Sequence, residues 1–169
     1  APEDVTAMAV PFAFELRMEF LVGRILQMTL TMKNCSESEQ VITDALHTYF
    51  NVKSAEAIVI RGLDAVEYEN RVVGAEAFGC VQDRIYLDTT GAVEILDPGF
   101  DRTIVVEKFG SASTVVWNPW IRKSHAMPDF GDEEYHTMVC IEAVNASKDR
   151  RTLPPGGSHV LSQKITVKR

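Results

Sequence analysis

Apolar and polar side chains alternate along much of the chain, which is typical of β-strands with one buried face. The clearest run covers residues 12–20, where large apolar side chains take every second position. A second alternating run covers residues 25–33 and is followed by a polar turn, so we expect the two to be antiparallel neighbours. Further strands are expected at 45–50, 57–61, 81–87, 92–97, 103–108, 113–117, 135–145 and 160–167.

Turn residues separate these runs, and no segment keeps a 3.6-residue period over three helical turns. The predicted fold class is therefore all-β, most simply an antiparallel β-sandwich. The chain has 169 residues and shows no repeat, low-complexity tract or linker that would divide it. We therefore expect residues 1–169 to form a single domain.

The charge balance limits the possible partners. Lys and Arg total 17 against 24 for Asp and Glu, which gives a net charge of −7 without any long basic run. Such a chain is a poor ligand for nucleic acid or for an anionic membrane, and no apolar stretch is long enough to cross one. The expected partner is a small molecule or another protein.

Three widely spaced cysteines make a disulfide framework improbable and favour a cytoplasmic location.

Three polar residues fall on apolar strand faces, where an unpaired polar group costs about 1–3 kcal/mol. They are His47, Asp83 and Glu142. A carboxyl group among apolar neighbours tends to have a raised pKa, and histidine exchanges protons near neutral pH without tuning. These are the properties of general acids and bases.

Each of the three also has a structural interpretation. His47 would be a satisfied histidine at the rim of the core, and Asp83 would pair with Arg84 or Arg102. Glu142 is the hardest to explain structurally, since it lies within an apolar run.

Other chemistries find less support in the sequence. No paired-histidine or Cys-x-x-Cys spacing indicates a zinc site, and the glycine-rich nucleotide and hydrolase motifs are missing. We therefore expect no metal. Trp117 and Trp120 flank Asn118 and Pro119, an arrangement that suits either sugar stacking or packing.

Several segments resemble one family in order and spacing. Residues 43–50, TDALHTYF, are similar to the strand that bears the catalytic histidine of the glucose-6-phosphate 1-epimerases, within the aldose 1-epimerase or galactose mutarotase-like superfamily. Residues 138–143, MVCIEA, resemble the strand with the catalytic glutamate. The other matching segments are Gly62-Leu63 with Tyr68, residues 83–87 (DRIYL), residues 115–120 (VVWNPW) and residues 153–156 (LPPG).

The resemblance implies an activity and a site. It implies interconversion of the α and β anomers of a hexose 6-phosphate without a cofactor. Glu142 would be the general base and His47 the general acid, while Asp83, Trp117 and Asn118 would bind the substrate. Positioned acid and base groups typically contribute about 10²–10⁴-fold to a rate.

The resemblance covers only the C-terminal portion of the family's β-sandwich. Nothing here matches the family's upstream Arg-Gly-Gly and His-Gly segments or its basic residues for the 6-phosphate. Arg122 and Lys123 would either take the place of these phosphate-binding residues or form a solvated surface pair. We therefore expect a sandwich that lacks N-terminal strands and leaves apolar faces uncovered, which a homodimer would cover. The alternatives are a non-catalytic sugar-binding or interaction β-sandwich, or an inactive fragment of an active epimerase.

Overall fold

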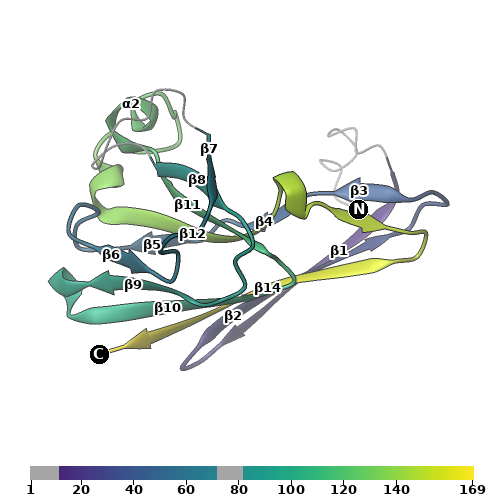
Figure 1. Cartoon of the computed structure of the whole chain (residues 1–169), viewed down its shortest axis with the longest axis horizontal. Helices are drawn as coiled ribbons and strands as arrows, with labels where there is room; N and C mark the ends of the chain where they lie inside the picture. The colour runs from purple at the N-terminus through teal and green to yellow at the C-terminus, as the bar shows by residue number, and fades with distance from the viewer. Residues whose placement is uncertain (1–11, 72–81) are drawn as a thin grey trace.

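The computed structural model describes residues 12–71 and 82–169, whose strands form two large facing sheets with antiparallel pairing (Figure 1). The first sheet has the order β1 (Phe14–Val22), β2 (Leu26–Asn34), β14 (Ser158–Lys168), β10 (Arg102–Phe109), β9 (Val93–Asp97) and β6 (Val59–Arg61). The second has the order β4 (Asp44–Leu46), β12 (Met138–Asn145), β11 (Ser113–Asn118), β8 (Gln82–Tyr86) and β7 (Tyr68–Asn70), with β5 (Tyr49–Asn51) also paired to β12.

Short elements connect the sheets. A small pair joins β3 (Gln40–Ile42) to β13 (Arg151–Leu153). The short helix α2 (Trp120–Ser124) and the 3₁₀ turn η2 (Glu134–Thr137) lie in the connection between β11 and β12. Two further 3₁₀ turns are η1 (Pro98–Phe100) and η3 (Ser147–Asp149). No helix within the described residues is long and apolar enough to cross a membrane.

The main core lies between the two sheets. Its buried side chains alternate along strands of both sheets, for example Ile95 and Ile104 in the first and Val116 and Ile141 in the second. A second apolar cluster lies on the opposite face of the second sheet and includes Trp117 and Cys140. The strands β11 and β12 are therefore buried on both faces.

The predicted all-β sandwich is confirmed, and each predicted strand overlaps an observed one. Two predicted boundaries are wrong. Residues 45–50 form two short strands interrupted at His47 and Thr48, and the run at 135–145 starts with η2, so its strand begins at Met138. Position 81 of the run 81–87 lies outside the described residues.

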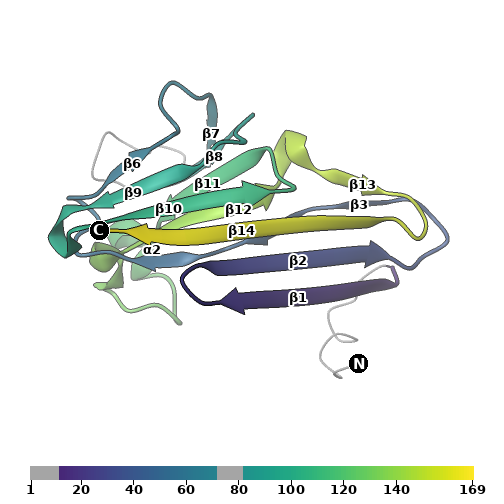
Figure 2. The ribbon, with the colours of Figure 1, turned by 90° about the horizontal axis from the view of Figure 1, so that it is seen from below.

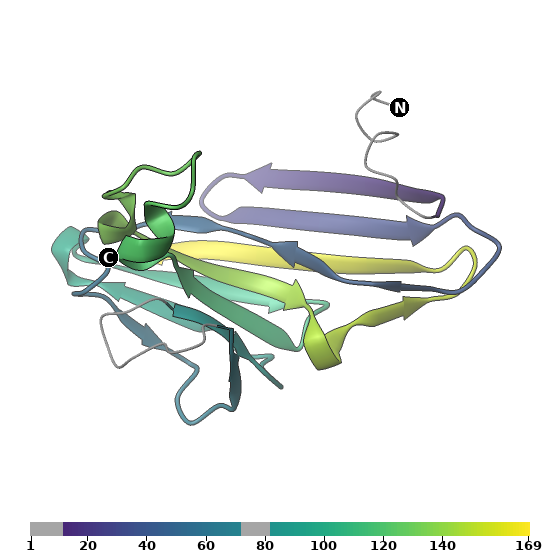
Figure 3. The same cartoon turned by 90° about the horizontal axis from the view of Figure 1, so that it is seen from above.

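The apolar side of β1 is more exposed than its alternation predicts. Leu16 is 55% exposed and Phe20 62% exposed, although both pair across to apolar residues of β2. The reason is topological: β1 is an edge strand, and Figures 2 and 3 show it at the margin of the first sheet beyond the strands of the second. Leu16 and Phe20 therefore stay largely exposed among the described residues. This agrees with the expectation that some apolar faces are left uncovered.

Candidate active site

The register of the second sheet brings the predicted residues onto one face. Asp83 on β8 pairs with Trp117 on β11, and Trp117 pairs with Cys140 on β12. Cys140 in turn pairs with Tyr49 on β5. Glu142 lies two residues beyond Cys140, so its side chain is on the same face. This face lies opposite the main core.

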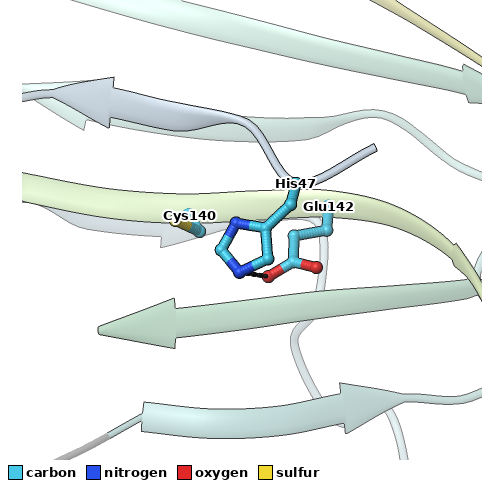
Figure 4. Close-up of side chains that lie close together, drawn as sticks. All are labelled: His47, Cys140 and Glu142. Atoms are coloured by element: carbon cyan, nitrogen blue, oxygen red, sulfur yellow. Dashed lines mark ion pairs between the residues drawn. The ribbon is translucent and has the colours of Figure 1, made fainter. Parts of the chain in front are cut away.

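His47 completes the group from the break between β4 and β5. Leu46 and Phe50 point into the protein and are buried, which directs His47 and Tyr49 outward on the other side. The His47 Nε2 atom lies 3.2 Å from Glu142 Oε1 (Figure 4). The Glu142 side chain is 6% exposed and that of His47 is 45% exposed. The carboxyl group is therefore enclosed, while the imidazole borders solvent.

Burial shifts both groups of this pair towards their neutral forms. It raises the pKa of Glu142 to about 8, and the neighbouring Asp83 carboxylate adds to the increase. Burial also lowers the pKa of His47, and the Lys123 ammonium group acts in the same direction. Both shifts favour a protonated carboxyl beside a neutral imidazole, a pair with one transferable proton and one basic nitrogen.

Aromatic rings form a wall beside the pair. The His47 and Tyr49 rings stack with centroids 4.9 Å apart, and Trp117 meets the His47 ring edge-on at 5.5 Å. Tyr49 is 51% exposed, whereas Trp117 is buried. Tyr49 was not among the predicted site residues, although its position two residues after His47 on the same predicted strand face was an available signal. Exposed aromatic faces of this kind can stack on the C–H face of a sugar.

Asp83 lies at the rim with a partner that the sequence did not predict. Lys123 Nζ is 3.4 Å from Asp83 Oδ2 and also lies 5.2 Å from the centroid of the Trp117 ring. The two expected arginine partners are engaged elsewhere. Arg102 pairs with Asp97, and Arg84 lies over the ring of Tyr68.

Asn118 is buried, and its side chain is used within the fold. Its amide nitrogen donates hydrogen bonds to the carbonyl oxygens of Tyr135 and Met138, at 2.8 Å each. Its Oδ1 accepts a hydrogen bond from the backbone N–H of Trp120 at 2.8 Å. Asn118 thus joins the start of α2 to η2 and β12, while its expected contact with substrate stays a prediction.

Comparisons with known proteins identify the family of this chain. A family model described as aldose 1-epimerase matches residues 3–166. The chain belongs to the aldose 1-epimerase family. A protein named "Putative glucose-6-phosphate 1-epimerase" from Cenchrus ciliaris is 33% identical over 92% of this chain and 50% of its own length. One of the same name from Escherichia coli K12 is 33% identical over 93% of this chain and 54% of its own length.

Solved structures show the same fold. One is the crystal structure of a "putative mutarotase" from Salmonella typhimurium, whose sequence is 28% identical to this chain. The two structures superpose with a TM-score of 0.85, and the match covers 99% of this chain and 58% of the other. A galactose mutarotase-like protein from Clostridium acetobutylicum, 16% identical with a TM-score of 0.68, shares the fold. The resemblance to the aldose 1-epimerase family is thus confirmed. The chain spans about half the length of the curated relatives it matches.

Proposed function

We propose that this chain holds the acid–base part of a site that interconverts the α and β anomers of a hexose 6-phosphate. The observation that supports this most directly is the 3.2 Å contact between His47 and Glu142 on an aromatic-walled sheet face. Membership of the aldose 1-epimerase family and the names of the relatives support the same choice.

The proposed reaction moves only protons and one carbon–oxygen bond. A proton shift from Glu142 to His47 along their contact yields a carboxylate and an imidazolium. Glu142 then removes the proton of the C1 hydroxyl while His47 protonates the ring oxygen, and the C1–O5 bond breaks to give the open aldehyde. Rotation about C1–C2 and the reverse transfers close the ring as the other anomer. No proton is gained or lost overall.

The surrounding residues would bind and orient the sugar. Asp83 accepts a hydrogen bond from a sugar hydroxyl in this proposal, and Tyr49 stacks against the ring. Lys123, half-exposed and next to Asp83, is the cation best placed to face a 6-phosphate from this rim. We propose a cytoplasmic location, where hexose phosphates occur.

A second function has one observation in its favour. Because the chain spans about half the length of its relatives, it would also suit a sugar-binding β-sandwich without turnover, or an inactive piece of an epimerase. These alternatives predict a folded chain with no rate enhancement.

Exchange NMR of the anomers of glucose 6-phosphate distinguishes the functions. We expect the chain to accelerate exchange, and Glu142→Gln and His47→Ala each to reduce that acceleration by about 10²–10⁴-fold. The control is His136→Ala, because His136 and Glu133 also lie 3.2 Å apart but in an exposed pair. No acceleration by a chain that is folded by circular dichroism would reject the catalytic proposal. Sugar-induced shifts of the Tyr49 ring signals would then favour binding without turnover.

A further inference from the structure

Cys140 supplies a third potential metal ligand to the His47–Glu142 pair, and the proposed acid–base reaction makes no use of it. One ligand atom from each residue, a ring nitrogen, the thiol sulfur and a carboxylate oxygen, lies within 4.8 Å of the other two. Figure 4 shows the three side chains together beside β12. Within residues 12–71 and 82–169, no other three His, Cys, Asp or Glu side chains meet in this way.

The backbone explains why these three atoms converge. Cys140 and Glu142 are two residues apart on β12, so their side chains share a face, and every residue of that strand is buried. The neighbouring break between β4 and β5 places His47 across from Glu142. Two ligands therefore come from a buried strand, while the third is a half-exposed side chain from an irregular segment.

The three ligand atoms lie near the spacing of a tetrahedral zinc site but have not reached it. Zinc bonds of about 2.0–2.3 Å to nitrogen, oxygen and sulfur place ligand atoms about 3.3–3.7 Å apart. The His47–Glu142 contact of 3.2 Å already has this spacing. Contraction from the 4.8 Å limit to this spacing requires ligand atoms to approach by about 1 Å or a little more.

The donor set selects the kind of ion. A thiolate favours Zn²⁺ and Co²⁺ over Mg²⁺ and Ca²⁺, which prefer oxygen ligands. We propose that His47, Cys140 and Glu142 form an inhibitory binding site for a zinc-type divalent cation, with one coordination position left for water. The bound cation takes up the imidazole nitrogen and the carboxylate that the proposed reaction uses. The cation displaces the thiol proton of Cys140 and the carboxyl proton of Glu142 to solvent. This differs from the expectation of no metal, because residues 47, 140 and 142 have no recognisable zinc spacing along the chain.

Cobalt provides a direct test, since thiolate coordination to Co²⁺ gives a near-ultraviolet charge-transfer absorption band. Purified, metal-free chain is titrated with Co²⁺, and Zn²⁺ binding is measured by calorimetry. The Cys35→Ser/Cys80→Ser double variant retains Cys140 as its single thiol. We expect this double variant to show the band at one equivalent of Co²⁺ and Cys140→Ser to lack it. Loss of His47 should weaken Zn²⁺ binding by at least about tenfold, since even outer partners of a metal site contribute 10–100-fold.

Controls separate the site from surface binding and from misfolding. His47→Ala changes a half-exposed side chain, so it tests the site even if Cys140→Ser unfolds, which thermal melting would reveal. His136→Ala removes an exposed histidine beside Glu133 and should leave binding unchanged. A band that survives in Cys140→Ser, or no band in the folded double variant, would overturn the proposal. Because the measurement is of metal binding, it does not depend on epimerase activity.

Discussion

The Thr48 Oγ1 hydroxyl donates a hydrogen bond to Gln163 Oε1 at 2.5 Å, joining the residue after His47 to the opposite sheet. Gln163 is fully buried on β14, and its Nε2 donates to the carbonyl oxygen of Ile141 at 2.8 Å. One side chain therefore contacts the direct neighbours of both His47 and Glu142. Gln163 is a positioning residue, since it does not touch the pair itself.

Replacing Gln163 should loosen the His47–Glu142 pair. We expect Gln163→Leu to cost about 1–3 kcal/mol of unfolding free energy, because the Thr48 and Ile141 groups lose a buried partner. Thr48→Val keeps the shape of the side chain and removes only the hydrogen bond between Thr48 and Gln163, so it should lower the free energy of unfolding by less. The readouts are urea unfolding, and the NMR line widths of the His47 ring under conditions where each variant is folded. Unchanged His47 line widths in both variants would show that Gln163 acts on stability alone.

The buried amide of Asn118 is expected to be needed for the loop that borders the site. Asn118→Ala would remove the donor that the carbonyls of Tyr135 and Met138 share, at a cost of about 1–3 kcal/mol. That corresponds to a Tm decrease of several degrees for a chain of this size. Asn118→Asp retains the acceptor for the Trp120 N–H but places a carboxylate oxygen against the two carbonyl oxygens, so it should cost at least as much as Asn118→Ala. Melting curves like that of the wild type for both variants would contradict this account.

Strand alternation predicted the positions of His47 and Glu142 because a period of two assigns each residue to a face. It could not show that the break at His47 and Thr48 points the imidazole at Glu142, since the contacts around this break include Gln163, more than a hundred residues away. Nor could it show that Cys140 joins the group. The pairing of Asp83 with Lys123 was also not predicted. Lys123 belongs to α2, which lies in an irregular connection that no periodicity describes. The expectation of a single domain stays a prediction.

Lys108 should give the folded state a measurable pH dependence. Its Nζ donates to the carbonyl oxygens of Thr89 and Ser111, and burial lowers the pKa of Lys108 from 10.5 to about 8 despite the opposing Asp149 carboxylate. The positive charge of Arg151 lowers the pKa of Lys108 further. Between pH 8 and 10.5 the unfolded chain therefore binds more protons at Lys108 than the folded chain does. The contribution of Lys108 to the free energy of unfolding accordingly rises with pH across that window.

A comparison with Lys108→Met isolates this contribution. The variant cannot titrate at this position, so other ionisable groups cancel in the difference between the two proteins. We expect the wild type to gain stability relative to Lys108→Met from pH 8 towards 10.5, by up to roughly 1.4 kcal/mol per pH unit. Urea unfolding at intervals across this range measures the difference. Parallel stability curves would mean that Lys108 titrates normally in the folded protein.

The uncovered apolar side of β1 should make the chain self-associate. Leu16, Met18 and Phe20 form an exposed row on an edge strand, an arrangement that proteins usually cover. We expect the weight-average mass in sedimentation velocity to rise with concentration towards a dimer, and Phe20→Glu to shift it towards the monomer. Leu21→Glu is the matched control, because it adds the same charge to the same strand but on the opposite face. If both variants dissociate the assembly equally, charge repulsion and not the apolar row explains the effect. A wild type that stays monomeric at high concentration would show that this row does not drive association.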